Sequence, residues 1–150
     1  MNEANAVEIL IVEDTPQDLE LTLRALRKAK LSNRIQVARD GAEALEFLFC
    51  EGQHAGRKIE EAPKVILLDL KLPKIDGIEV LRRIKADSRT KMIPVAVLTS
   101  SKEQKDVIES YQLGVNSYIV KPVNFEGFAG AVRDLGMYWL LLNQSPRIEK

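Results

Sequence analysis

The chain has 150 residues, with 22 basic and 22 acidic side chains, so its formal net charge is zero. Balanced charge excludes a strong overall field toward nucleic acid or an anionic membrane. A lone cysteine, Cys50, excludes an internal disulfide, and no Cys/His cluster has the spacing of a metal site. The sequence shows no signal-peptide pattern and no apolar run of membrane-spanning length. We therefore expect one soluble, cytoplasmic domain of residues 1–150, with a core of about 8–142 and a polar tail at 143–150.

Five short apolar stretches predict buried β-strands. They lie at residues 9–12, 35–38, 65–68, 95–98 and 118–120. All but the second are unbroken apolar runs, which suits strands that are covered on both faces of a parallel sheet.

A helical pattern follows each predicted strand. Thr15 and Pro16 are typical of an N-cap and a first helical residue, and Gly114 is typical of a helix end. Residues 40–43 resemble a capping box, and residues 51–63, which include His54, are expected to form a long exposed connection. The predicted helices begin near residues 16, 40, 77, 102 and 124, and the last ends near residue 142. Strands that alternate with helices predict an α/β fold with a parallel sheet and right-handed crossovers.

Four of the predicted strands are followed by, or end in, polar residues that can take part in chemistry. These residues are Glu13 and Asp14 after the first strand, Asp69 after the third, Thr99 after the fourth and Lys121 after the fifth. Because the carboxyl ends of parallel strands meet at one edge of a sheet, we expect these side chains to converge in one crevice. Each alone has an ordinary explanation as a turn, capping or surface residue, but the joint arrangement is harder to explain in that way.

Electrostatics indicates what such a cluster can do. Two carboxylates about 4 Å apart repel by roughly 4 kcal/mol at an effective dielectric constant of about 20, so three acids need a cation. Carboxylate oxygens with room for water suit Mg²⁺, and a lysine and a hydroxyl suit the oxygens of a phosphate. A carboxylate beside the metal can itself be the nucleophile, which predicts phosphoryl transfer to a side chain.

With these motifs in this order, the sequence resembles the receiver domains of two-component response regulators over nearly its whole length. The motifs lie at residues 12–14, 68–73, 76–77, 98–100 and 120–122. The resemblance implies a flavodoxin-like, doubly wound sheet with strand order 2-1-3-4-5. The connection around His54 and the apolar segment 138–140 more narrowly resemble single-domain regulators that are paired with bacterial phytochrome kinases.

The resemblance implies that Asp69 accepts a phosphoryl group from a phosphohistidine on a sensor kinase. Thr99 and Lys121 would each bind a phosphoryl oxygen, and Tyr118 would turn inward when Thr99 is drawn to the phosphate. The peptide bond between Lys121 and Pro122 is cis in the family.

The resemblance also implies a Mg²⁺ site formed by Asp14, Asp69 and the backbone carbonyl of Lys71. Glu13 would act through a metal-bound water, and here the sequence departs from the Asp found in many members. Lys71 and Ser101 occupy positions that in the family tune how fast the phosphoryl group is lost.

The last predicted helix has an apolar stripe that suits packing on the sheet, but its final turns are apolar almost all round. The simple interpretation is a helix end covered by the chain's own tail, and the alternative is a partner interface. We favour a homodimer through this helix, with the following interface residues: Phe128, Leu135, Tyr138, Trp139 and Leu142.

The favoured function is a stand-alone, phosphorylation-dependent signalling module that is not an enzyme, with a sensor histidine kinase as partner and no nucleic acid or membrane. One alternative is a receiver-like binding module that is never phosphorylated, against which the complete set of site residues argues. Another is a Mg²⁺-dependent aspartyl-phosphate phosphatase, which needs a second Asp where this chain has Lys71. A flavin-binding domain on the same fold is disfavoured because acids after the first strand would repel its phosphate.

Overall fold

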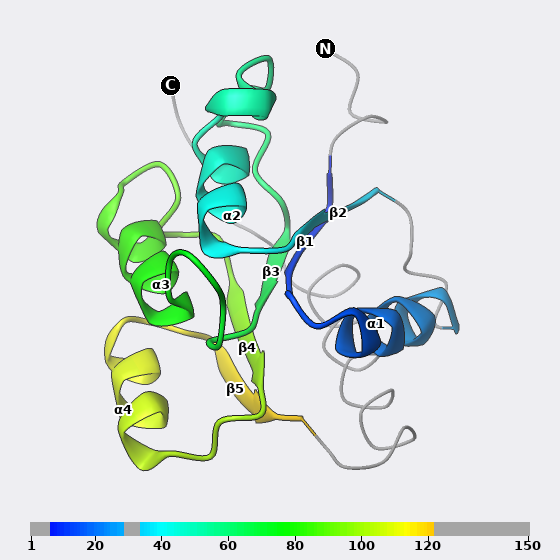
Figure 1. The fold of residues 1–150 in the computed structure, drawn as a ribbon. Coiled ribbons are helices and arrows are strands. Elements are labelled where there is room, and N and C mark those ends of the chain that lie inside the picture. The colour runs from blue at the N-terminus through cyan, green and yellow to red at the C-terminus, as the bar shows by residue number, and fades with distance from the viewer. Residues whose placement is uncertain (1–6, 29–33, 122–150) are drawn as a thin grey trace.

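The computed structural model describes residues 7–28 and 34–121, and the strands among them form one parallel sheet (Figure 1). The strands are β1 (Ile9–Val12), β2 (Ile35–Ala38), β3 (Val65–Leu68), β4 (Val95–Thr99) and β5 (Ser117–Val120). Their order across the sheet is β2-β1-β3-β4-β5, and every neighbouring pair is parallel, so the predicted fold class and strand order are confirmed.

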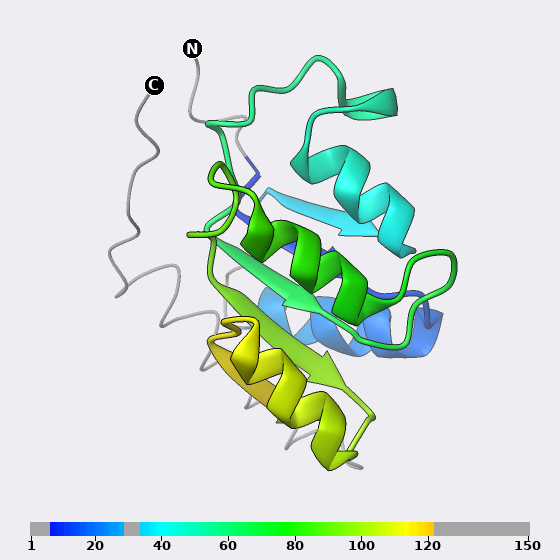
Figure 2. The same ribbon diagram turned by 90° about the vertical axis from the view of Figure 1, so that its left-hand side faces the viewer.

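Helices cover both faces of this sheet. The helical segments are α1 (Pro16–Lys28), α2 (Gly41–Leu48), the short 3₁₀ helix η2 (Gly52–His54), α3 (Gly77–Ala86) and α4 (Gln104–Gln112). Helix α1 lies on one face, while α2, α3 and α4 lie side by side on the other (Figures 1 and 2). Because both faces are covered, all residues of β1, β3 and β4 are buried, which explains their unbroken apolar sequences.

The central strands divide their side chains between two hydrophobic cores. Leu10, Ile66 and Leu68 point into the core beneath α2 and α3, whereas Ile9 and Leu67 point into the core beneath α1. Successive residues of a strand face opposite sides of a sheet, so an unbroken apolar run supplies both cores at once.

The local signals at helix ends agree with the structure in most places. Helix α1 begins at Pro16, and the chain leaves α4 through Gly114, whose φ of 98° suits glycine. The Asp40 side chain accepts a hydrogen bond from the Glu43 amide at 2.7 Å, as in a capping box. The Glu43 carboxylate, however, accepts from the amide of Arg39 and not from that of Asp40, so the second half of the motif is displaced by one residue.

The connection between α2 and β3 is less free than the sequence suggested. Its residues are mostly exposed, but the Arg57 guanidinium lies 3.7 Å from the centre of the Phe47 ring and donates to the backbone oxygens of Phe47 and Glu61. The His54 ring meets Phe47 edge-on, with ring centres 5.0 Å apart. The expectation of a long exposed connection therefore holds, but side-chain contacts tie it to α2.

Some predictions lie outside the described residues. They are the helix from residue 124 to 142, its five interface residues and the peptide bond between Lys121 and Pro122. Among residues 7–28 and 34–121, no helix is both long and apolar enough to cross a membrane.

Candidate functional site at the carboxyl edge of the sheet

Strand register brings the predicted residues to one edge of the sheet. Val12 of β1 is paired with Leu68 of β3, so Glu13 and Asp69 follow neighbouring positions. The ladder continues one residue further, since the Asp69 amide donates to the Val12 oxygen at 3.0 Å. On the other side, the Lys121 amide donates to the Thr99 oxygen at 2.8 Å. The backbone pairing thus places the Cα atoms of Glu13, Asp69, Thr99 and Lys121 at the same edge of the sheet.

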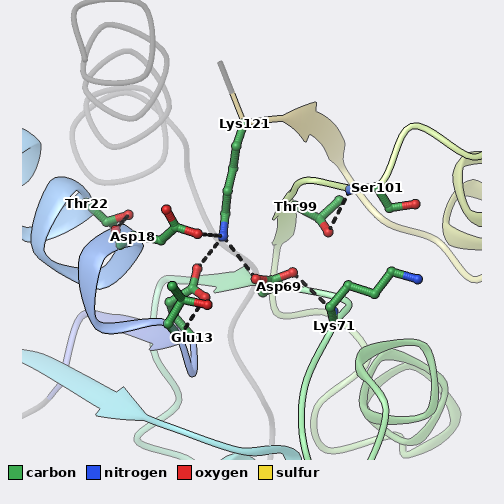
Figure 3. A network of polar contacts seen from close by, with 9 residues as sticks. Glu13, Asp18, Thr22, Asp69, Lys71, Thr99, Ser101 and Lys121 are labelled. Atoms are coloured by element: carbon green, nitrogen blue, oxygen red, sulfur yellow. Dashed lines mark hydrogen bonds and ion pairs between the residues drawn. The ribbon is translucent and has the colours of Figure 1, made fainter. Parts of the chain in front are cut away.

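A lysine lies at the centre of the site (Figure 3). Lys121 Nζ is 2.6 Å from Glu13 Oε1, 2.8 Å from Asp18 Oδ2 and 3.0 Å from Asp69 Oδ2. An ammonium group has three protons to donate, and here each has a carboxylate acceptor. Because the side chains of Lys121, Glu13 and Asp69 are all at least nine-tenths buried, these contacts are shielded from water.

Asp18 was not predicted as a site residue. It lies in the first turn of α1, where an acid is ordinary because it complements the partial positive charge of the helix end. Its side chain is 34% exposed and reaches the site from the side opposite Thr99 (Figure 3). Nothing in the local sequence separates this role from simple helix stabilisation, so only the fold identifies the residue.

Three carboxylates form a candidate metal centre. One oxygen from each of Glu13, Asp14 and Asp69 lies within 4.8 Å of the others, and Asp14 is the most accessible of the three. Hard oxygen donors at this spacing suit Mg²⁺ or Mn²⁺. The Lys71 amide donates to Asp69 Oδ1 at 3.1 Å, which places the Lys71 backbone against the same carboxylate.

The charges in the site perturb one another. Burial, reinforced by the negative charge of Asp69 and opposed by the hydrogen bond from Lys121, raises the pKa of Glu13 to about 7. Burial alone would lower the pKa of Lys121, but its hydrogen bonds to Asp18 and Glu13 and the charge of Asp69 together hold it above its usual value. The cluster thus holds more acid than Lys121 alone neutralises, and a divalent cation would complete the balance.

Thr99 and Tyr118 are joined through one residue. The Ser101 amide donates to Thr99 Oγ1 at 3.3 Å, and the Tyr118 hydroxyl donates to the Ser101 backbone oxygen at 3.0 Å. Thr99 is fully buried, whereas Tyr118 is half-buried. A change in the position of Thr99 would therefore act on the residue that holds the Tyr118 hydroxyl.

Gly77 allows the start of α3 to pack closely against the Asp69 backbone. A Cβ atom at Gly77 would lie 2.4 Å from the Asp69 backbone oxygen and 2.5 Å from the Leu70 Cα. The Gly77 amide donates to the Leu70 oxygen at 3.0 Å, and the Asp76 side chain caps the helix by accepting from the Ile78 amide. The sequence indicated a turn here, and the structure adds that only glycine lets the start of α3 lie this close to the backbone of Asp69 and Leu70.

Comparison with known proteins agrees with this fold and site. The chain matches the response regulator receiver domain over residues 9–133. Response regulator Rcp1 of Synechocystis is 40% identical over 132 residues, which cover 88% of each chain. The Mn²⁺-bound form of Rcp1 is similar in structure, with a TM-score of 0.85, 38% identity and coverage of 93% of this chain and 99% of that one.

Two further solved structures are similar. The phosphorylated cyanobacterial phytochrome response regulator RcpA has a TM-score of 0.86 and 39% identity, over 93% of this chain and 98% of its own. The bacteriophytochrome response regulator RtBRR has a TM-score of 0.75 and 54% identity, over 93% of this chain and 84% of its own. This chain therefore belongs to the response regulator receiver family, whose receiver domains are signalling modules and not classical enzymes.

Proposed function

We propose that this protein is a stand-alone receiver that is switched by phosphorylation of Asp69. The observation that carries the proposal is the placement of the Asp69 carboxylate, which clusters with oxygens of Glu13 and Asp14 and also accepts a hydrogen bond from Lys121. A phosphoryl acceptor needs this combination of an anionic nucleophile, a cation site and a donor for phosphoryl oxygens. The proposed domain has its core at about residues 8–142, and the family match over residues 9–133 supports this extent.

In the proposed reaction, an Asp69 carboxylate oxygen attacks the phosphorus of a phosphohistidine on the kinase. The new bond joins that oxygen to phosphorus, and the bond from phosphorus to the imidazole nitrogen breaks, with its electron pair left on the imidazole. Asp14, Asp69 and the Lys71 carbonyl would hold Mg²⁺, with Glu13 acting through a water. Bound Mg²⁺ would supply positive charge to offset that of the phosphoryl oxygens.

Lys121 and Thr99 then stabilise the product. The Lys121 ammonium can exchange a carboxylate acceptor for a phosphoryl oxygen, which is itself an anionic acceptor. The Thr99 hydroxyl accepts from the Ser101 amide and still has its own proton to donate to another phosphoryl oxygen. Movement of Thr99 would displace Ser101, release the Tyr118 hydroxyl and shift a two-state equilibrium of the face that carries Tyr118.

We propose that the kinase partner is of the phytochrome type. We also propose that this kinase and the present chain are both cytoplasmic. Support comes from likeness to RcpA and RtBRR, whose names associate them with phytochromes. We also propose a homodimer through the helix that the sequence predicts at 124–142, and no binding of nucleic acid, in keeping with the apolar pattern of that segment and the zero net charge.

The test is incubation with Mg²⁺ and acetyl phosphate, followed by intact-mass measurement. Wild type should gain one phosphoryl group, Asp69→Asn should gain none, and chelation of Mg²⁺ should prevent labelling. Asp87→Asn is a matched control, because this carboxylate is bound by Arg89 beyond the end of α3 and lies outside the cluster. Equal labelling of wild type and Asp69→Asn would show that the acceptor is another residue.

A further inference from the structure

A buried carboxylate at the start of α4 contacts two residues that flank the site. Asp106 is 9% exposed and lies in the first turn of that helix. The Ser101 hydroxyl donates to Asp106 Oδ2 at 2.5 Å, and the Lys71 ammonium lies 3.9 Å from the same oxygen. The side chains of two different loops are thus held by one carboxylate on a third element.

The same two residues touch the proposed phosphoryl site through their backbones. The Lys71 amide donates to Asp69 Oδ1, and the Ser101 amide donates to Thr99 Oγ1. Figure 3 shows the side chains of Lys71 and Ser101 pointing away from Asp69 and Lys121. Each residue therefore has its amide in the site and its side chain held outside it.

We infer that Asp106 is a positioning residue that sets the lifetime of the phosphoryl group by holding the Lys71 ammonium away from Asp69. The inference rests on the proposed function, because it concerns loss of the group from phosphorylated Asp69. Lys71 has a flexible stem of four carbons and a side chain that is 61% exposed, so its ammonium can move once the ion pair is broken.

The physical consequence concerns attack by water. In phosphoryl loss, a water oxygen forms a new bond to phosphorus, the bond from phosphorus to Asp69 breaks with its electron pair left on the carboxylate, and the water proton passes to phosphate or solvent. A released Lys71 ammonium is attracted to the phosphoryl oxygens, and there its side chain obstructs the approach of the attacking water. This obstruction slows hydrolysis, so Asp106 in its present place keeps the phosphorylated state short-lived.

The variant that isolates this contact is Asp106→Asn. The amide oxygen of Asn can still accept from the Ser101 hydroxyl, whereas the charge that attracts Lys71 is lost. We expect the rate constant for phosphoryl loss, followed by intact mass after removal of acetyl phosphate, to fall roughly two- to fivefold, the range that a partly exposed ion pair supports. In a Lys71→Met background there is no ammonium to release, so Asp106→Asn should change the rate constant for phosphoryl loss by less than about twofold.

Glu109→Gln is the matched control. Glu109 lies on the same helix and carries the same charge, but it pairs with Arg82 and not with Lys71. It should leave the rate of phosphoryl loss unchanged in both backgrounds. The inference is overturned if Asp106→Asn changes the rate of phosphoryl loss equally in the wild-type and Lys71→Met backgrounds, or changes it in neither background. In that case, labelling of the wild-type protein by acetyl phosphate still upholds the proposed function. Failure of wild type itself to accept a phosphoryl group overturns the proposed function, and the inference with it.

Discussion

Asp18 Oδ2 and Lys121 Nζ lie 2.8 Å apart, although 103 residues separate them in the chain. The contact joins the first turn of α1 to the end of β5 and adds a third carboxylate to the partners of the lysine. The Lys121 ammonium is expected to bind a phosphoryl oxygen, so the Asp18 carboxylate competes with an incoming phosphoryl group for this ammonium.

Asp18→Asn should increase the rate of labelling by acetyl phosphate about two- to fivefold, because Lys121 loses one competing anion in a partly exposed pair. The free energy of unfolding should change by less than about 1 kcal/mol, since Lys121 keeps Glu13 and Asp69 as partners. Initial labelling rates and urea unfolding measure the two effects. Glu20→Gln, on the same helix but paired with Arg27, should leave the rate unaltered, and a slower Asp18→Asn would contradict competition.

Glu13 should give metal-free protein an unusual dependence of stability on pH. Its pKa of about 7 in the folded protein exceeds the ordinary value of 4.5, so between these values the folded state binds more protons than the unfolded state. The free energy of unfolding should therefore fall as pH rises through this window, by an amount on the order of 1–3 kcal/mol.

Urea unfolding from pH 4.5 to 8 in the presence of a chelator measures this slope. Glu13→Gln removes the titrating group, so the difference between wild type and variant isolates its contribution. Added Mg²⁺ should restore wild-type stability at pH 8 and have less effect at pH 5, where Glu13 is protonated. Identical slopes for the two proteins would show that Glu13 titrates normally in the folded state.

Gly77→Ala should destabilise the protein by about 1–3 kcal/mol, because its Cβ would overlap the backbone at Asp69 and Leu70 and neither atom belongs to a flexible side chain. Displacement of Asp69 should also slow labelling by acetyl phosphate. Gly56→Ala is the control, since a Cβ there meets nothing within 4 Å. Its effect on unfolding should stay within about 0.5 kcal/mol. Equal stability of the two variants would argue against the tight approach of α3.

Arg57→Ala should loosen the connection between α2 and β3. The variant loses the cation–π contact with Phe47 and the hydrogen bonds to two backbone oxygens, together worth about 1–3 kcal/mol. Hydrogen exchange and limited proteolysis should increase within residues 51–63, while labelling of Asp69 remains as in wild type. Lys58→Ala, at an exposed neighbouring position, serves as control. Unchanged protection in Arg57→Ala would mean that the connection is held by other contacts.

Much of the site follows from strand ends. Unbroken apolar runs such as 65–68 require burial on both faces, which requires a parallel sheet and therefore one shared carboxyl edge. That reasoning alone groups Glu13, Asp69, Thr99 and Lys121 at one edge of the sheet. Residue roles came from the resemblance to receivers, and the structure brings these four side chains to one edge.

The contacts of Asp18, Asp106 and Arg57 were decided by tertiary structure alone. Two of them are acids in first helical turns, where the helix end itself accounts for a negative charge, and the third is a cation in a polar connection. A local pattern records the conformation and burial of its own segment, but it does not show which side chain of another element will be the partner, as Lys121 is of Asp18 across 103 residues. The sequence by itself thus determined which elements form and which edge carries the site, because hydrophobic periodicity is a local property. Only the folded chain decided which charges meet there, because those pairings depend on distances between separate elements.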